Sequence, residues 1–529
     1  MTSWWRGAVI YQVYPRSFCD SNGDGVGDLA GISNKLEYIA DLGVDAIWIS
    51  PFFKSPMKDF GYDVEDFRQV DPRFGSLEDF DVLLGKAHSL GLKVIIDQVY
   101  SHSSDQCEWF RQSRQSADND KSDWYTWANA GDDGSPPNNW QSAFGGPAWT
   151  WDESRGQYYL HNFLPEQPDL NLHTAEVREE LLDIARFWLD RGVDGFRLDA
   201  TNHLMHDPTL PDNPGSQISP QEHTDNSPVV LHNASHPDTV GFLEDIRTCL
   251  DQYHGRFSVA EVGGPNSLRD IRQFTQGPDR LHTGYSFVFL DLSELSARAI
   301  KQAVCYWNDF DDVWPSWTFN NHDGPRVVSR WNNGHEPVQL AKTLQTLLFA
   351  LRGTLFLYQG EELGLPQADI PFEKLKDPEA LANWPDTMGR DGARTPMPWV
   401  GREKNGGWTK ASWMPVDEAH FELCVEDQIR DTDSPLAHCR RILNLRKKHR
   451  ALIEGSIEFI DAPEDVLAFV RAGGNESILC VFNLGRTEKR WVSQADAFDR
   501  PEDYLFEFGG FVQGKPRLLP PLGGFLGRL

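Results

Sequence analysis

The chain lacks the long apolar segments of a membrane protein. No run of about 18 apolar residues occurs in its 529 residues, so no transmembrane helix is expected. The first residues, MTSWWRGAVI, contain no basic segment followed by an apolar run and a small-residue cleavage site, so no secretory signal is expected either.

Cysteine is scarce and unpatterned. The seven cysteines stand singly, their number is odd, and no CxxC pair occurs. This pattern argues against a disulfide framework, because such frameworks use an even number of cysteines at regular spacings. Free, buried thiols are typical of a reducing compartment, so a cytoplasmic protein is expected.

Basic charge is also in short supply. The 50 Lys and Arg residues are outnumbered by 79 Asp and Glu, for a net charge of −29. Such a surface repels phosphate backbones and anionic lipids, so nucleic acid and membranes are poor partners and a neutral substrate fits better.

Aromatic residues make up 12% of the chain. Since the CH faces of sugars stack on aromatic rings, a carbohydrate site is one explanation for that share.

Eight short runs of apolar, β-branched residues alternate with helical stretches and glycine-marked turns. They are residues 8–15, 44–51, 93–100, 193–200, 256–262, 283–290, 316–323 and 354–362. Repeated strand–helix alternation with buried strands predicts a parallel sheet, and eight repeats predict an α/β fold of the (β/α)8 barrel type. A doubly wound open sheet is the alternative, and the absence of a Gly-rich phosphate loop disfavours it.

The long connections predict the domain organisation. Residues 103–172, after the third strand, are predicted to form a small inserted domain, because ordinary loops are much shorter. The barrel would then comprise residues 1–102 and 173–454. The pattern changes to short strands and turns in residues 455–529, which predicts a C-terminal antiparallel β-sandwich. Residues 201–240 are polar and rich in proline, and we expect them to form a lid or rim.

Polar residues gather where several predicted strands end, which is where such barrels place their chemistry. They are Asp97 and His102 after the third strand, Arg197 and Asp199 after the fourth, Glu261 after the fifth, and Asn321, His322 and Asp323 after the seventh. The carboxylates of Asp199, Glu261 and Asp323 come from separate strands and are expected to converge on one mouth.

Two of these carboxyl groups have different surroundings. Arg197 and Asp199 are two residues apart, so on a strand they point the same way, and the arginine favours an ionised, nucleophilic Asp199. Glu261 is flanked by apolar residues and glycines, and poor solvation favours a protonated group suited to general acid catalysis. A pair in these states is the apparatus of retaining glycoside hydrolysis, in which the carboxyl groups lie about 5–5.5 Å apart.

The chain resembles glycoside hydrolase family 13, the α-amylase family, over nearly its whole length. The motifs that carry the resemblance are DQVYSH (97–102), GFRLDA (195–200), VAEV around Glu261, FNNHD (319–323) and QPDLN (167–171). QPDLN, together with GRDGARTPMPW (389–399), is typical of the oligo-1,6-glucosidase and α-glucosidase branch.

The resemblance implies a role for each strand-end residue. Asp199 would be the nucleophile, Glu261 the acid/base, and Asp323 the group that grips two sugar hydroxyls and aids distortion of the ring. The other members would form the shell of the glucose subsite: Arg197, His102 and His322 line it, and Asp97 orients them.

The stretch KDFGYDV (58–64) matches the part of the family site that holds the end of the sugar. By this resemblance Tyr62 stacks on the terminal glucose and Asp59 binds its distal hydroxyls. The family pairs this aspartate with an arginine from a late loop, here Arg390, with Arg394 as the alternative, and the closed pocket implies exo-action. Two further aromatic residues, Phe144 and Phe163, would complete the wall, unless they are core side chains.

The stretch DSNGDGVGD (20–28) has the spacing of a calcium loop. Its ligands would be Asp20, Asn22, Asp24, Asp28 and the backbone carbonyl of Val26, as in an EF-hand loop without its terminal Glu. One structural Ca²⁺ or Mg²⁺ is therefore expected, with a merely solvated acidic turn as the alternative. The calcium that α-amylases hold between barrel and inserted domain is not expected, because Ser101 replaces an asparagine that helps bind it.

The resemblance also bears on specificity. Within this branch, valine directly after the nucleophile accompanies α-1,6 cleavage, and this chain has Ala200, so α-1,4 linkages are favoured. We expect an exo-acting α-glucosidase on short oligosaccharides that also transfers glucose to alcohols. The alternatives are an oligo-1,6-glucosidase, a sucrose-active glucosyltransferase or isomerase, and an inactive adaptor relative, which would have lost its carboxylates. The oligomeric state stays open.

Overall fold

The computed structural model describes residues 3–214, 231–310, 312–385, 387–409, 412–491, 501, 503–511 and 518–529. The chain forms two compact units. The first comprises Met1–Trp48, Gly85–Lys93 and Phe287–Leu529, and the second comprises Ile49–Leu84 and Val94–Ser286. Part of the predicted lid or rim, residues 215–230, lies outside the described residues.

Eight strands form one sheet, and each strand lies inside one of the eight predicted runs. They are β1 (Val9–Val13), β2 (Ala46–Ile49), β5 (Lys93–Gln98), β9 (Gly195–Leu198), β10 (Phe257–Val262), β11 (Thr283–Ser286), β12 (Ser316–Thr318) and β13 (Thr354–Tyr358). Their order is β11-β10-β9-β5-β2-β1-β13-β12. Successive strands lie side by side, except that β11 and β12 stand at the two ends of this order, and the first strand, β1, lies beside the last, β13. A doubly wound sheet would instead reverse its order at a switch point. The predicted (β/α)8 barrel is thus confirmed.

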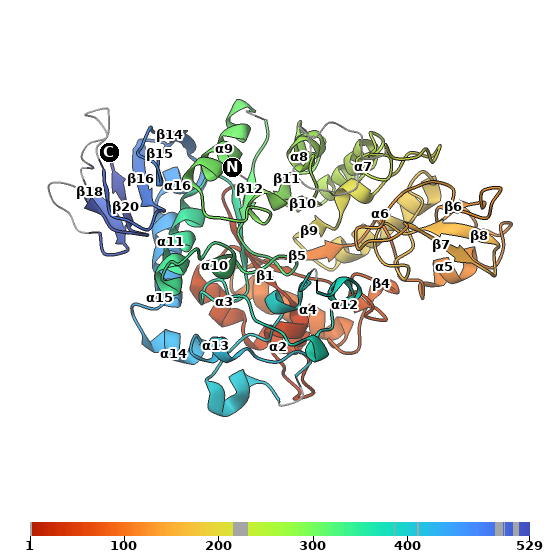
Figure 1. Ribbon diagram of the computed structural model, residues 1–529, viewed down its shortest axis with the longest axis horizontal. Helices are drawn as coiled ribbons and strands as arrows, with labels where there is room; N and C mark the ends of the chain where they lie inside the picture. The colour runs from red at the N-terminus through yellow and green to blue at the C-terminus, as the bar shows by residue number, and fades with distance from the viewer. Residues whose placement is uncertain are drawn as a thin grey trace. The chain divides into compact units, whose positions relative to one another are not determined.

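In the first unit, β13 lies parallel to both β1 and β12, with Leu355 opposite Val9 and Trp317. The helices of this unit are α1 (Pro15–Phe18), α2 (Leu29–Asn34), α3 (Leu36–Leu42), α9 (Ala297–Cys305), α10 (Val327–Arg330), α11 (Pro337–Ala350), α12 (Pro378–Asn383), α13 (Glu418–Phe421), α14 (Val425–Arg430), α15 (Pro435–Lys448) and α16 (Arg450–Glu454). Helix α11 begins where the Glu336 carboxylate accepts two backbone N–H groups, with proline in the first turn. It packs against α15 (Figure 1).

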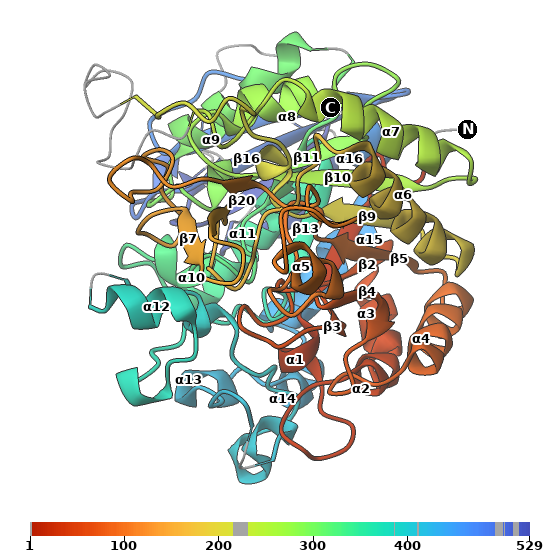
Figure 2. The same cartoon turned by 90° about the vertical axis from the view of Figure 1, so that its right-hand side faces the viewer.

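In the second unit, β5, β9, β10 and β11 are joined by parallel ladders. All six residues of β10 are buried, as expected for a strand covered on both faces. The helices of this unit are α5 (Glu108–Ser113), α6 (Ala175–Asp190), α7 (Thr239–Asp251) and α8 (Ser267–Thr275), while α4 (Leu77–Ser89) is divided between the units. Helices α6 and α7 lie side by side (Figure 1 and Figure 2).

The second unit also carries two smaller sheets. One is a hairpin of β3 (Phe53–Lys54) and β4 (Asp66–Val70). The other contains β6 (Trp127–Ala128), β8 (Gln157–Leu160) and β7 (Trp149–Asp152) in that order, all antiparallel. Its core includes Trp140 and Trp149. The three-stranded sheet falls wholly within residues 103–172, the predicted inserted domain, whose exact boundaries remain a prediction.

The end of the chain forms the predicted antiparallel sheet, drawn in blue in Figure 1. Its strands are β14 (Ser456–Phe459), β15 (Val466–Gly473), β16 (Glu476–Asn483), β20 (Gly524–Arg528) and β18 (Asp503–Phe508), in that order, beside a short pair of β17 (Lys489–Arg490) and β19 (Leu518–Leu519). An apolar cluster that includes Trp491, Leu519 and Phe525 stabilises this region.

Two absences expected from the sequence can be compared with the structure. All seven cysteines carry free thiols. Among the described helices, none has the length and apolarity needed to span a bilayer.

Candidate active site

The centre of the second unit's site is the buried guanidinium of Arg197, on β9. Its side chain is 1% exposed. Nη1 donates to Asp97 Oδ1 and to Asp199 Oδ1, each at 2.6 Å, and Nη2 contacts the Glu261 carboxylate. Because β9 lies between β5 and β10, residues from three adjacent strands meet on one cation.

This cation stays charged at any physiological pH. Burial acts to lower the pKa of Arg197, but the carboxylates of Asp97 and Glu261 outweigh it and hold the pKa well above its ordinary value. From the sequence, Arg197 was expected beside Asp199, and Glu261 was expected in apolar surroundings. In the structure the guanidinium contacts both, so the expectation of apolar surroundings for Glu261 was wrong. The guanidinium therefore fixes the positions of both carboxylates that the sequence predicted as the catalytic pair.

A second contact joins the ends of β9 and β10. The backbone N–H of Ala200 donates to Glu261 Oε2 at 3.0 Å. Ala200 itself adopts φ 42° and ψ 47°, in the left-handed region that non-glycine residues rarely occupy. The chain turns sharply just after Asp199, and this strained turn aims the Ala200 N–H at Glu261.

The predicted sugar-stacking tyrosine lies against the same cluster. Tyr62 is buried, its hydroxyl is 3.5 Å from Asp97 Oδ2, and the Arg197 Cζ lies 5.9 Å from its ring centroid. The structure thus brings together Tyr62, Asp97 and Arg197.

Asp59 and His102 are joined by Gln167, a residue that the sequence analysis did not select. Gln167 Nε2 donates to Asp59 Oδ2 at 3.2 Å and lies 3.1 Å from His102 Nε2. All three side chains are buried. Gln167 opens the QPDLN motif, so the motif contained the signal, but only the fold shows what the residue contacts.

His102 is neutral in this environment. Burial lowers its pKa to about 3, so the ring offers one hydrogen-bond donor and one acceptor rather than a positive charge. The Phe163 ring lies 5.1 Å from it, and Phe144 lies 6.0 Å from Phe163. Both phenylalanines are only half-buried, which favours the wall interpretation over the core interpretation.

A separate cluster follows β12 in the first unit. His322 Nδ1 is 2.9 Å from Gln12 Nε2, and the His322 ring stacks on Tyr14 at 5.5 Å. Asp323 Oδ2 is 3.3 Å from His322 Nε2, and its Oδ1 accepts from Arg394 Nη2 at 2.8 Å. Arg394 also donates through Nε to the His322 backbone carbonyl, at 2.7 Å. It therefore holds the backbone of His322 and the carboxylate of Asp323 at the same time.

Arg390 is anchored by Asp377, another residue that the sequence analysis missed. Asp377 accepts from Arg390 Nη2 at 2.8 Å and from the Arg390 backbone N–H at 2.6 Å. Burial acts to raise the pKa of Asp377, but Arg390 outweighs it and lowers the pKa. Arg390 Nη1 then lies 3.6 Å from Asp323 Oδ1. Asp377 also caps α12 through the Glu379 N–H, so the Asp-Pro pair marks a helix start in the sequence, but nothing in the sequence indicates the contact with Arg390. The pairing of Asp59 with Arg390 or Arg394 stays a prediction.

The predicted calcium loop forms a tight turn held by its own carboxylates. Asp20 accepts from the Gly23 and Gly25 N–H groups, and Asp24 accepts from the Val26 N–H. Asp28 caps α2 through the Gly31 N–H. The donor set consists of oxygens, which suits Ca²⁺ or Mg²⁺. Among the described residues, however, no group of three or more His, Cys, Asp or Glu side chains is placed to hold a metal ion.

Comparisons with known proteins agree with this geometry. Residues 12–455 match the family model described as the α-amylase catalytic domain. A probable α-glucosidase of Rhizobium meliloti (strain 1021) is 48% identical over 497 residues, covering 91% of this chain and 89% of the relative. An oligo-1,6-glucosidase of Heyndrickxia coagulans is 36% identical, covering 95% of each chain.

Solved structures give the same result. The crystal structure of the α-glucosyl transfer enzyme XgtA superposes with a TM-score of 0.93 at 48% identity, covering 100% of both chains. The trehalulose synthase MutB from Pseudomonas mesoacidophila MX-45 superposes with a TM-score of 0.91 at 31% identity, covering 100% of both chains. The chain is therefore a glycoside hydrolase of the α-amylase family, glycoside hydrolase family 13, in the branch of the α-glucosidases and oligo-1,6-glucosidases.

Proposed function

We propose that the protein is a retaining, exo-acting α-glucosidase that releases glucose from the non-reducing end of short α-glucosides. The observation that carries the proposal is the pairing of Asp199 and Glu261. The two carboxylates extend from the ends of adjacent strands, and Arg197 contacts both. A pair of carboxyl groups on neighbouring strands is what double displacement at an anomeric carbon needs.

In the first step, Asp199 attacks the anomeric carbon while Glu261 donates its proton to the glycosidic oxygen. The glycosidic bond breaks, the aglycone leaves as an alcohol, and a β-glucosyl ester forms on Asp199. In the second step, the Glu261 carboxylate takes a proton from water, and the resulting nucleophile displaces Asp199 from the sugar. Glucose leaves with its original configuration, and both carboxyl groups return to their starting states.

The remaining residues of the proposal bind the glucosyl ring. Asp323 would accept hydrogen bonds from two ring hydroxyls, and Arg394 holds its carboxylate in position. The proposed subsite consists of Asp59, Tyr62, His102, Phe144, Phe163, Arg197, His322 and Arg390, with Asp97 orienting the shell. His102 is uncharged, and its two ring nitrogens lie 2.9 Å from Ser101 Oγ and 3.1 Å from Gln167 Nε2, so these contacts hold the ring in position beside the proposed subsite.

Transfer of glucose to alcohols is a second part of the proposal. The glucosyl ester on Asp199 reacts with any hydroxyl that reaches it, so an alcohol acceptor gives a new α-glucoside where water gives glucose. The 48% identity to the α-glucosyl transfer enzyme XgtA supports this part.

A panel of maltose, isomaltose, sucrose, trehalose, kojibiose and nigerose, with products followed over time, tests the function. We expect glucose from maltose at the highest kcat/KM, together with transfer products at high substrate concentration. The likeness to MutB, a trehalulose synthase, makes a sucrose-isomerising activity the second candidate. Conversion of sucrose to isomeric disaccharides without net hydrolysis would replace our proposal by that one.

Ala200→Val, measured on the same panel, tests the origin of linkage preference. The added methyl groups crowd the space next to Asp199. An α-1,6 bond holds the leaving sugar one methylene farther away than an α-1,4 bond, so the ratio of isomaltose to maltose cleavage should rise about tenfold. A β-branched residue is also strained at the positive φ of this position, so Tm should fall. The control is Ala200→Gly, which fits that conformation without strain. An unchanged ratio in Ala200→Val would refute this account of the preference.

We further propose that Asp20, Asn22, Asp24, Asp28 and the Val26 carbonyl bind one Ca²⁺ or Mg²⁺, which would stabilise the turn before α2. Chelation with EDTA should then lower Tm by several degrees and re-added Ca²⁺ should restore it, because an ion that binds only the folded state stabilises that state. Asp24→Asn should abolish the response, whereas Asp132→Asn, at another exposed loop aspartate, should keep it. A Tm that chelation leaves unchanged would contradict the ion site.

A cytoplasmic location is also part of the proposal, and the seven free thiols support it.

A further inference from the structure

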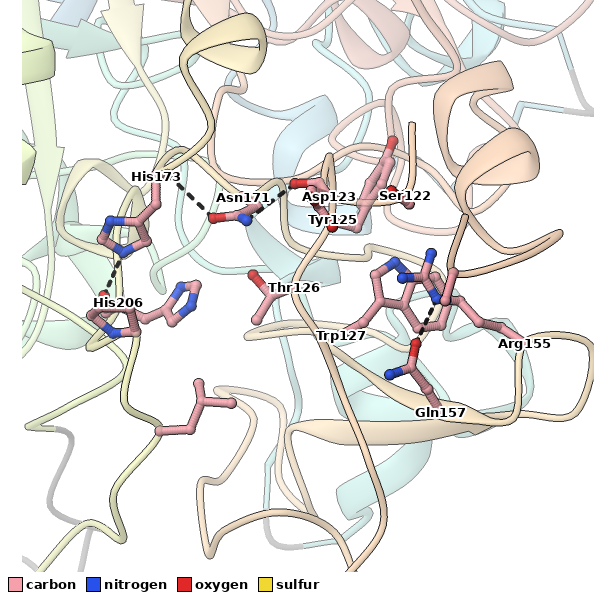
Figure 3. Close-up of a pocket in the computed structure, with 13 residues that line it drawn as sticks. Ser122, Asp123, Tyr125, Thr126, Trp127, Arg155, Gln157, Asn171, His173 and His206 are labelled. Atoms are coloured by element: carbon pink, nitrogen blue, oxygen red, sulfur yellow. Dashed lines mark hydrogen bonds between the residues drawn. The ribbon is translucent and has the colours of Figure 1, made fainter. Parts of the chain in front are cut away.

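A pocket lies in the second unit, beside the three-stranded sheet (Figure 3). Its volume is about 380 Å³, and 13 residues line it. The lining comes from residues 117–127 leading into β6, from residues 155–157 at the start of β8, from residues 171–173, and from residues 206–210. None of these residues belongs to the proposed catalytic site. The volume lies within the range of small-molecule sites in proteins.

Thr126 is the most informative residue of the lining. It is 6% exposed, and within the described part of the chain its hydroxyl has no hydrogen-bond partner. Its backbone is fixed, since its N–H donates to the Asp169 carbonyl and its own carbonyl accepts from Leu160. A buried hydroxyl without a partner destabilises the fold, because it has lost its hydration and gained no hydrogen bond in exchange. In Figure 3 this side chain lies between His206 on one side and Trp127 on the other, so a molecule in the pocket could satisfy it.

Two histidines add polar groups to the lining. Burial and the neighbouring His173 lower the pKa of His206 to about 3, so its ring is uncharged. His173 lies against it, with ring centroids 5.3 Å apart, and its Nε2 donates to the His206 carbonyl at 2.8 Å.

The charged groups of the lining nearly cancel. Arg155 donates to Gln157 and to the Ser113 carbonyl, and its guanidinium stacks on Trp127 at 4.3 Å. The carboxylate of Asp123 balances it electrostatically. Asp123 would repel a phosphate, and Arg155 would repel a simple cation, so the lining favours neither kind of ion.

The lining also indicates how an occupant would be held. The Phe110 and Trp127 rings stack at 5.6 Å, and Arg155 covers Trp127 as well, so this indole is not a platform for a ligand. Aliphatic contacts come instead from Pro208 and Leu210, and polar contacts come from hydroxyl, amide and imidazole groups. Neutral donors and acceptors beside small aliphatic surfaces match a polyhydroxylated molecule, whose hydroxyls alternate with CH groups.

We propose that this pocket is a second, non-catalytic carbohydrate site, which binds a neutral sugar of one or two rings through the Thr126 hydroxyl and the His206 imidazole. The proposal goes beyond the glucosidase function and does not depend on it. A protein without glucosidase activity would still bind sugar here.

The test uses the full chain with glucose and maltose as probes. Crystals of the Asp199→Asn protein, in which turnover is blocked, are soaked with each sugar, and affinities are measured by calorimetry. We expect a sugar in hydrogen-bond contact with Thr126 and His206. Thr126→Val should weaken that site about fivefold, the effect of one neutral hydrogen bond, and should leave Tm unchanged or higher because the unpartnered hydroxyl is gone. In the otherwise wild-type protein, kcat/KM should be unchanged by the same substitution.

Two control variants test whether the effect on sugar binding comes from the Thr126 hydroxyl itself. Thr126→Ser keeps the hydroxyl and should bind like the parent protein. Thr150→Val removes a hydroxyl that bonds to His161 in the same sheet, so it should lower Tm without changing sugar binding. The proposal is overturned if neither sugar occupies the pocket at 100-fold the KM for maltose, if Thr126→Val binds as tightly as the parent, or if inorganic phosphate binds there and sugar does not.

Discussion

Asp199→Asn should lower kcat/KM for maltose by about 10⁴-fold or more, because an amide cannot form the glucosyl ester on which both steps depend. The loss should be the same for activated aryl glucosides, since no leaving group replaces a missing nucleophile. The amide oxygen can still accept from Arg197 Nη1, so the fold and the position of Glu261 should be retained. Steady-state kinetics, with Tm and circular dichroism as checks on folding, measure the effect.

The matched control is Asp245→Asn, at an exposed position on α7. This substitution removes the same charge from the same unit and should leave kcat/KM within twofold. The intermediate can also be observed directly. After a rapid quench with an activated 2-fluoroglucoside, the peptide that contains Asp199 should carry one added sugar. Normal turnover by pure Asp199→Asn protein, or a label on another residue, would remove Asp199 from the role of nucleophile.

Glu261→Gln should separate substrates by their leaving groups. For maltose, loss of the general acid should lower kcat/KM about 10²–10⁴-fold, because a sugar alkoxide leaves poorly without a proton. An aryl glucoside with a strongly acidic phenol needs little protonation, so its glycosylation step should be nearly unaffected. The second step still lacks a general base, and the glucosyl ester should therefore accumulate. Stopped-flow release of the phenol should show a burst equal to the enzyme concentration, followed by slow turnover.

Azide provides a check on this assignment. A small anionic nucleophile needs no base, so it should restore turnover of the aryl glucoside in Glu261→Gln and form an α-glucosyl azide. The Glu261 carboxylate also contacts Arg197 and the Ala200 N–H, so a purely structural loss has to be considered. A structural loss would lower the rates for maltose and the aryl glucoside equally, with no burst and no azide rescue, and that outcome would exclude Glu261 as the acid.

The barrel and the positions of its polar strand ends could be predicted from the order of amino acids. Each of the eight strands lies inside a run that short-range patterning had marked, because alternation of buried strands with amphipathic helices is a local property of the chain. The two-residue spacing of Arg197 and Asp199 likewise fixed their common direction, and the structure places both in contact. Family motifs then supplied roles that spacing alone does not give.

The contacts among these groups could not be predicted in the same way and became known from the folded chain. Glu261 is 64 residues from Arg197, yet it shares the guanidinium with Asp199. Gln167 is 108 residues from Asp59, to which it donates a hydrogen bond. Among the described residues, the Thr126 hydroxyl has no hydrogen-bond partner, and it lies in a pocket lined by four separate segments of the chain. Local patterns report which face a residue presents, whereas a contact across dozens of residues depends on how strands and loops pack, and packing is a property of the folded chain.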